Sequence, residues 1–253
     1  VSEPLSESPA SRYGASSIRR RPARRAPRPG SRVPAAAAVA FAALLGACDA
    51  PPAAWTQASV PEPTVFAPGA VSSEERDYDI TFSPDGREAY FTRRSRRGPP
   101  RIVLSRWTGT EWAEPEDVPF ASGRDESPFV SPDGGTLYFS SRRPWPGEIE
   151  PSDNLCQVTR EVSGWGEPEP VPGPVNRPHR EHGRYTLGTE LGPTLLGDGG
   201  LLYWTREDPE WGGDLYVALP DGEGGFGAPA PLRINSYGDE SNPVMSPAGE
   251  WIV

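Results

Sequence analysis

The sequence contains no lysine, only two cysteines and only two histidines, and it has no G-x-S-x-G motif. All 25 basic residues are arginine, a bias that indicates a GC-rich coding sequence rather than a functional demand. Two cysteines are too few for a disulfide framework. The missing motif excludes the nucleophile elbow of an α/β-hydrolase from these residues, and the lack of a sustained helical period after residue 50 argues against a helical fold.

Charge is divided sharply along the chain. The first 32 residues hold eight arginines and two glutamates, whereas the remainder holds 17 basic and 33 acidic residues, a net charge near −16. Nucleic-acid phosphates require a basic surface. So acidic a body argues against a nucleic-acid partner.

The basic N-terminal stretch leads into fifteen mostly apolar residues, 33–47, which end at Cys48. This order predicts a secretion signal over residues 1–47, because fifteen residues are fewer than the roughly 20 of a permanent membrane helix. The ending Leu-Gly-Ala-Cys resembles a bacterial lipobox. That resemblance implies that Cys48 is lipidated and anchors an exported protein to the membrane, facing the periplasm or cell surface. A buried apolar helix and a twin-arginine signal are the alternatives, and residues 48–73 are predicted to include a Pro- and Ala-rich tether.

A Ser-Pro-Asp-Gly turn between two short apolar runs occurs repeatedly. Versions of the turn are centred on Asp85, Asp133, Asp198 and Ala248, at steps of 48, 65 and 50 residues. Proline presets the turn and Gly134 is expected to take a left-handed backbone, while the flanking aromatic and β-branched residues favour strands. Each unit therefore predicts a β-hairpin.

Each step continues with a third apolar run and a weaker fourth one. The third runs begin at Arg101, Asn154 and Asp214. Four strands in a repeat of about 40 to 50 residues are typical of a propeller blade, and the 33 prolines and 28 glycines agree with a turn-dense, all-β fold. Cys156 falls in a predicted strand and is expected to be a small core residue.

These motifs, together with "DLYVA" from Asp214 and "INSYGDES" from Ile234, resemble the TolB-type β-propeller repeat of bacterial envelope proteins. The resemblance implies an all-β, partial β-propeller of about three to four four-stranded antiparallel blades. The expected repeats are 74–123, 124–187, 188–238 and an incomplete one at 239–253. The third and fourth copies depart from the pattern at Gly197 and Ala248. Because closed propellers have about four to eight blades, we expect the chain to be a fragment.

The second step, of 65 residues, exceeds the first, of 48, because two connections are longer. In an up-and-down blade these two connections emerge at the same end, opposite the Ser-Pro-Asp-Gly turns. Loops on a rigid scaffold often bind ligands, so this insert face is the expected binding face. Its candidate residues are Arg142, Arg143, Trp145, His179, Arg180, His182, Arg184, Tyr185 and Glu190. An acidic channel rim is expected at the same end, formed by Asp125, Glu126, Asp239 and Glu240, with exposed ion pairs as the alternative.

Motifs that carry chemistry are few. "GEGGFG" from Gly222 matches the dinucleotide fingerprint formally, but prolines and no helix follow, so a hairpin loop is predicted there. His179 and His182 alone are too few for a metal site. We expect no cofactor, no metal and no catalytic residue, and hence a non-catalytic binding module for an envelope protein, a cell-wall fragment or a glycan. The alternative is the propeller portion of a larger enzyme, either a serine peptidase or a polysaccharide lyase that uses the histidine loop.

Overall fold

The structure is a computed structural model, and it describes residues 62–145, 152–177, 180–182, 185–206, 212–246 and 252. The described residues from Val65 to Ile252 belong to one compact unit. In the described ranges, no helix has the length and apolar character needed to cross a membrane. The predicted signal segment and Cys48 lie outside the described residues.

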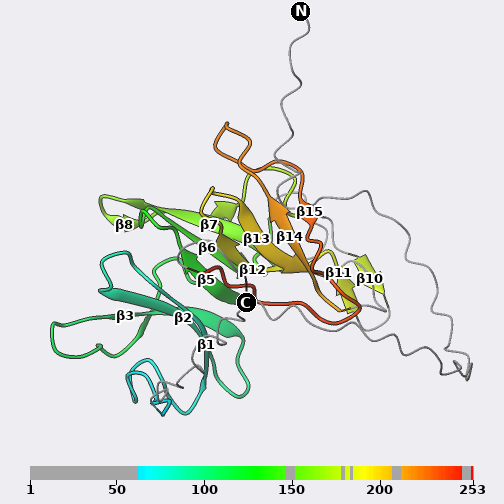
Figure 1. The fold of residues 1–253 in the computed structure, drawn as a ribbon. Coiled ribbons are helices and arrows are strands. Elements are labelled where there is room, and N and C mark those ends of the chain that lie inside the picture. The colour runs from blue at the N-terminus through cyan, green and yellow to red at the C-terminus, as the bar shows by residue number, and fades with distance from the viewer. Residues whose placement is uncertain are drawn as a thin grey trace, which may run out of the picture. The chain divides into compact units, whose positions relative to one another are not determined.

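Most strands form three antiparallel sheets whose members follow one another in chain order, except that β9 pairs with β7 (Figure 1). The first sheet contains β1 (Arg76–Phe82), β2 (Glu88–Arg94), β3 (Pro100–Arg106) and β4 (Glu116–Asp117). The second contains β5 (Asp125–Val130), β6 (Thr136–Ser141), β7 (Asn154–Glu161), β8 (Gly164–Trp165) and β9 (Glu169–Pro170). The third contains β12 (Glu190–Leu195), β13 (Leu201–Thr205), β14 (Asp214–Ala218) and β15 (Ala230–Pro231). A small hairpin of β10 (Arg180–His182) and β11 (Tyr185–Leu187) precedes the third sheet.

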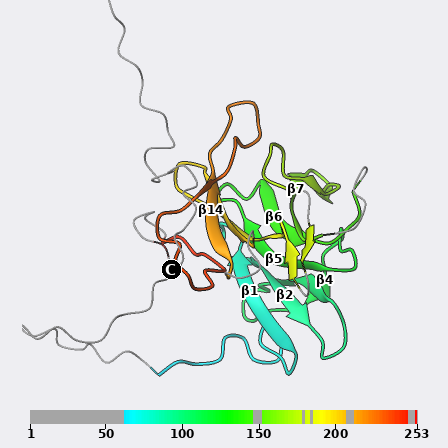
Figure 2. The ribbon, with the colours of Figure 1, turned by 90° about the vertical axis from the view of Figure 1, so that its right-hand side faces the viewer.

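The first strands of the three sheets are neighbours in space. β1 lies against β5, and β5 lies against β12; Figure 2 shows β1 and β5 after a 90° turn. We call β1, β5 and β12 the inner strands and each sheet a blade. This arrangement confirms the predicted all-β fold, a partial β-propeller of antiparallel blades, of which the first and third have four strands and the second has five. Residues 239–246 follow the third blade.

The first two hairpin turns have the geometry expected from their sequence. The Asp85 carboxylate accepts hydrogen bonds from the Ser83 hydroxyl at 2.6 Å and from the Arg87 backbone N–H at 3.1 Å. Asp133 is bonded in the same way within its own turn, and Gly134 has the predicted left-handed backbone, with φ of 73°. The turn aspartates therefore stabilise their own loops.

The third turn is one residue shorter than the first two. The Leu196 N–H donates to the Gly200 carbonyl, whereas Ser131 donates to Thr136 one position further on. As a result β13 is displaced by one residue against its inner strand. Trp204 and Phe139 both lie six residues after the aspartate of their turn, so equal turns would give them equivalent positions. Instead Trp204 pairs with Leu191 of β12, the position equivalent to the pairing of Ser140 with Glu126 of β5.

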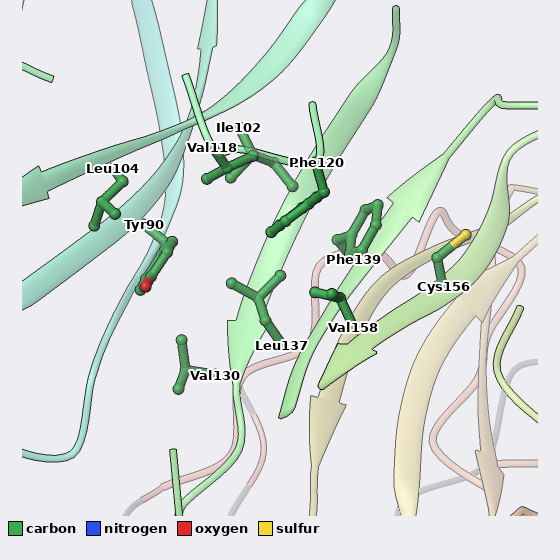
Figure 3. Close-up of a cluster of buried hydrophobic side chains, with 10 residues drawn as sticks. All are labelled: Tyr90, Ile102, Leu104, Val118, Phe120, Val130, Leu137, Phe139, Cys156 and Val158. Atoms are coloured by element: carbon green, nitrogen blue, oxygen red, sulfur yellow. The ribbon is translucent and has the colours of Figure 1, made fainter. Parts of the chain in front are cut away.

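Alternating side chains of the strands fill the spaces between neighbouring blades. Tyr90, Ile102 and Leu104 of the first blade pack against Leu137, Phe139, Cys156 and other residues of the second (Figure 3). Cys156 is fully buried in this cluster, which confirms the predicted core position. A second cluster joins β7 to β13 and β14. In a third cluster, Met245 and Ile252 pack against the other face of the third blade. Because successive strand residues face opposite sides, each blade contributes to two such layers.

Candidate ligand-binding pocket

Every inner strand is interrupted once at the same place in its blade. The pairing register slips once in β1, once in β5 and once in β12. A left-handed residue lies in each break: Asp79 with φ of 52°, Ser127 with 56° and Gly192 with 62°. Asn242, with φ of 48°, continues the series in the segment after β15. A bulge of this kind turns the backbone away from the sheet ladder, so four equivalent backbone corners result.

Each corner after the first, at Ser127, Gly192 and Asn242, is joined to the preceding blade by a hydrogen bond from the same register position. The three bonds run from Ser127 N–H to Thr92 Oγ1 (2.9 Å), from Gly192 N–H to Ser140 Oγ (3.2 Å) and from Trp204 Nε1 to Asn242 Oδ1 (3.2 Å). In the first two, a hydroxyl satisfies a backbone donor that the bulge removes from the ladder. In the third, the displaced tryptophan supplies the donor instead. The breaks are therefore held at fixed positions between blades.

The three strand breaks and the left-handed Asn242 line a single pocket of about 190 Å³. Its polar residues are Asp79, Thr81, Ser127, Thr194 and Asn242. Its apolar residues are Ile80, Pro128, Phe129, Pro193, Pro243, Val244 and Met245. Pockets for drug-sized ligands measure about 300 to 1,000 Å³, so this pocket suits a single side chain or a small terminal group.

The ionisable residue of the pocket lining is Asp79. Its Oδ2 accepts a hydrogen bond of 2.7 Å from the Ser127 hydroxyl of the next blade. Burial raises the pKa of the Asp79 carboxyl, and the bond from Ser127 opposes that rise. The pocket therefore holds a carboxylate whose charged form is poorly solvated.

The chemistry available in the pocket suits binding. The Ser127 hydroxyl donates to a carboxylate, and the described lining contains no imidazole or amine that could serve as its general base. Across the part of the chain that the structure describes, no group of three or more His, Cys, Asp or Glu side chains is placed to hold a metal ion. The lining thus combines one anionic group, several hydroxyl or amide groups and apolar walls.

The residues of the expected acidic rim are paired within the fold. Asp125 is 1 % exposed and forms an ion pair of 3.0 Å with Arg143. Glu126 accepts from the Tyr78 hydroxyl at 3.0 Å. Asp239 accepts from the Gly213 N–H, and Glu240 accepts from the Ser236 N–H at 3.0 Å. None of the four lines the pocket, and their role as a channel rim stays a prediction.

The insert face brings together several of the predicted binding residues. Arg142 and Arg124 both approach Asp153, at 3.3 and 3.4 Å, and the N–H of buried Glu190 donates to the Asp153 carbonyl. Arg143 is more enclosed, because its guanidinium lies over the Phe139 and Trp145 rings. Both long connections therefore meet where β12 begins.

The other predicted residues lie in the β10–β11 hairpin or outside the described residues. Arg180 and His182 lie in β10 and Tyr185 lies in β11, on paired strands. His179 and Arg184 lie outside the described residues, as does Cys48. The binding roles of these residues and the lipidation of Cys48 stay predictions.

The sequence analysis missed the pocket residues Asp79, Ser127, Gly192 and Asn242. One signal was present, because the last three each precede a proline. Proline lacks the N–H that a sheet ladder requires, so three Xaa-Pro pairs at one repeat position indicate interrupted inner strands. Asp79 precedes isoleucine and carried no such signal.

Comparisons with known proteins give structural likenesses only. No protein-family model matches the sequence, and none of the curated proteins matches it. Among solved structures, the chain is similar to TolB from Acinetobacter baumannii, with 20% identity and a TM-score of 0.46 over 69% of this chain and 36% of that one. It is also similar to a puromycin hydrolase S511A mutant complexed with PGG, with 14% identity and a TM-score of 0.43 over 66% of this chain and 23% of that one. The chain thus spans about a third of the length of that TolB.

Proposed function

We propose that this chain is a non-catalytic binding module whose ligand enters the pocket between the inner strands. The observation that carries the proposal is the convergence of three equivalent strand breaks and the left-handed Asn242 on one pocket that contains a carboxylate among apolar walls. Binding sites commonly have this composition, in which apolar surface supplies contact area and a few polar groups fix orientation. The interblade hydrogen bonds hold the pocket walls in place before a ligand arrives, which lowers the ordering cost of binding.

The insert face is proposed as a second contact surface for a larger partner. Arg142 is partly exposed there, and the β10–β11 hairpin extends the same connection. We propose that the partner is an envelope protein, a cell-wall fragment or a glycan, and that the protein is exported and anchored through lipid on Cys48. The support for this address is the order of basic, apolar and cysteine-containing segments in the sequence.

A pocket-filling substitution tests the binding proposal. Val244 lines the pocket and is 61% exposed, so Val244→Trp places a large ring into the pocket mouth with little cost to the core. The purified chain is screened by ligand-observed NMR against a panel of blocked amino acids, short peptides and cell-wall oligosaccharides. At least one class should bind, and Val244→Trp should weaken that binding about tenfold or more, equivalent to about 1.4 kcal/mol.

Val162→Trp is the matched control, since Val162 is fully exposed beyond β7 and outside the pocket lining. This variant should retain binding. Mass spectrometry of the same mixtures should show the panel members unchanged. Binding that survives in Val244→Trp would contradict the pocket as the site, and conversion of a panel member to product would contradict a non-catalytic role.

A further inference from the structure

Asp79 differs from the other acidic residues of the first two inner strands in its charge partners. Asp77 forms an ion pair with Arg93 at 2.7 Å, and Asp125 forms one with Arg143 at 3.0 Å. Within the described residues, no arginine lies at ion-pair distance from Asp79. The carboxylate that lines the pocket is therefore the one that the described fold leaves without a cation.

Hydrogen bonding shows the same contrast. A carboxylate can accept about four hydrogen bonds. Asp125 accepts hydrogen bonds from the Ser122 N–H and the Ser141 hydroxyl, and both of its oxygens accept from Nη2 of Arg143. Asp79 accepts from the Ser127 hydroxyl on Oδ2. A partly buried carboxylate is stabilised by a charged donor, so Asp79 retains capacity for one from a ligand.

The walls around Asp79 favour an apolar segment next to that donor. Ile80 is 43% exposed and Val244 is 61% exposed, and both line the pocket with three prolines. Covering such surface contributes about 25 cal/mol per Å². A stem of a few methylene groups would therefore gain from the walls, while its end reached the carboxylate.

From this geometry, and resting on the proposed function of the pocket, we propose that its ligand group is an alkyl stem ending in a primary ammonium or guanidinium, such as a lysine or arginine side chain of a partner, with Asp79 as the acceptor. The acidic body of the chain would also attract such a group over a distance. A neutral sugar hydroxyl is the competing group, and it would not require the negative charge.

The test compares matched probes on the purified chain. The probes are Nα-acetyl-lysine methylamide, Nα-acetyl-norleucine methylamide, which has a similar stem without the ammonium, and free pentylamine. Asp79→Asn removes the charge with little other change, because asparagine also accepts the left-handed backbone and its Oδ1 can still accept from Ser127. Asp117→Asn is the control for net charge, since Asp117 lies on β4 and its side chain is 61% exposed. Binding is followed through the methyl resonances of Ile80 and Val244.

The lysine probe should bind the unmodified chain at least tenfold more tightly than the norleucine probe. Asp79→Asn should reduce this ratio to about twofold or less, and Asp117→Asn should leave it unchanged. Equally tight binding of pentylamine would support the same ligand chemistry with a free amine as its source. Equal binding of the lysine and norleucine probes, or no binding of either, would overturn the cationic ligand. If the lysine and norleucine probes bind equally and both are lost in Val244→Trp, the pocket itself stands and only the ligand class is wrong.

Discussion

The indole Nε1 of Trp204 donates a hydrogen bond of 3.2 Å to Oδ1 of Asn242, at the register position where Thr92 and Ser140 accept from the backbone of the next blade. The bond thus ties the segment after β15 to the third blade. Asn242 lines the same pocket as Asp79 and Ser127.

Trp204→Phe should loosen this segment. Phenylalanine keeps the ring contact but lacks the donor, and a typical hydrogen bond contributes about 1 kcal/mol. We expect backbone amides of residues 239–246 to exchange with deuterium about fivefold faster. Trp107→Phe, in the first blade, should leave their exchange unchanged. Identical protection in both variants would show that Asn242 is held by other contacts.

Arg143→Met should destabilise the fold strongly. It leaves the Asp125 carboxylate buried without its cation, and breaking a buried ion pair from one side costs about 3 to 5 kcal/mol. Arg142→Met should cost less than about 1 kcal/mol, because Arg142 is partly exposed and Asp153 keeps Arg124. Urea unfolding measures both. Adding Asp125→Asn to Arg143→Met should recover part of the loss, and equal costs for the two arginines would contradict this assignment.

Asp77 should make the fold sensitive to acid. Burial opposes its ionisation, but the bonds from Arg93 and Ser73 outweigh burial, so the pKa of the Asp77 carboxyl lies below its ordinary value. A lowered folded-state pKa stabilises the fold above the unfolded value of about 3.9, and the gain is lost as pH falls through the folded value. The urea midpoint of the unmodified chain should therefore fall more between about pH 5 and about pH 3 than that of Asp77→Asn. Parallel pH curves would refute the coupling.

Gly173→Ala should be poorly tolerated. Gly173 has φ of 101°, and an added methyl would overlap the carbonyl oxygen of Phe226 on the third blade. We expect a loss of about 2 to 3 kcal/mol by thermal unfolding. Gly197→Ala is the control, because a methyl there meets nothing within 4 Å. A similar shift for both glycines would mean that the second and third blades can move apart to accept the methyl.

Cys48→Ala should abolish lipidation in cells. Cells grown with a tagged fatty acid should label the unmodified protein and release it only with detergent, since acyl chains supply the anchor. The alanine variant should carry no label and should leave the membrane fraction. Cys156→Ala should keep the label, because Cys156 is buried in the core between blades. Label that persists in Cys48→Ala would remove the proposed anchor.

Strands, turns and blade order followed from the sequence because they depend on local chemistry. The Ser-Pro-Asp-Gly turns need only proline geometry, a glycine such as Gly134 and a capping aspartate such as Asp133. The burial of Cys156 followed from its place in an apolar run. Such features are set within a few residues of chain, so pattern and spacing suffice to predict them.

Register and pairing across blades were decided only by the tertiary structure. The third turn is one residue shorter, so Trp204 takes the register position of Ser140 rather than that of Phe139, and a one-residue slip reverses the side that every following side chain faces. Sequence placed Asp125 and Arg143 at one end of a blade, but only packing made them a buried ion pair. The meeting of Asp79 with Ser127, 48 residues later, depends on two bulges and on the contact between two blades. No local pattern encodes such a distance, because it is the sum of many small backbone rotations along both strands.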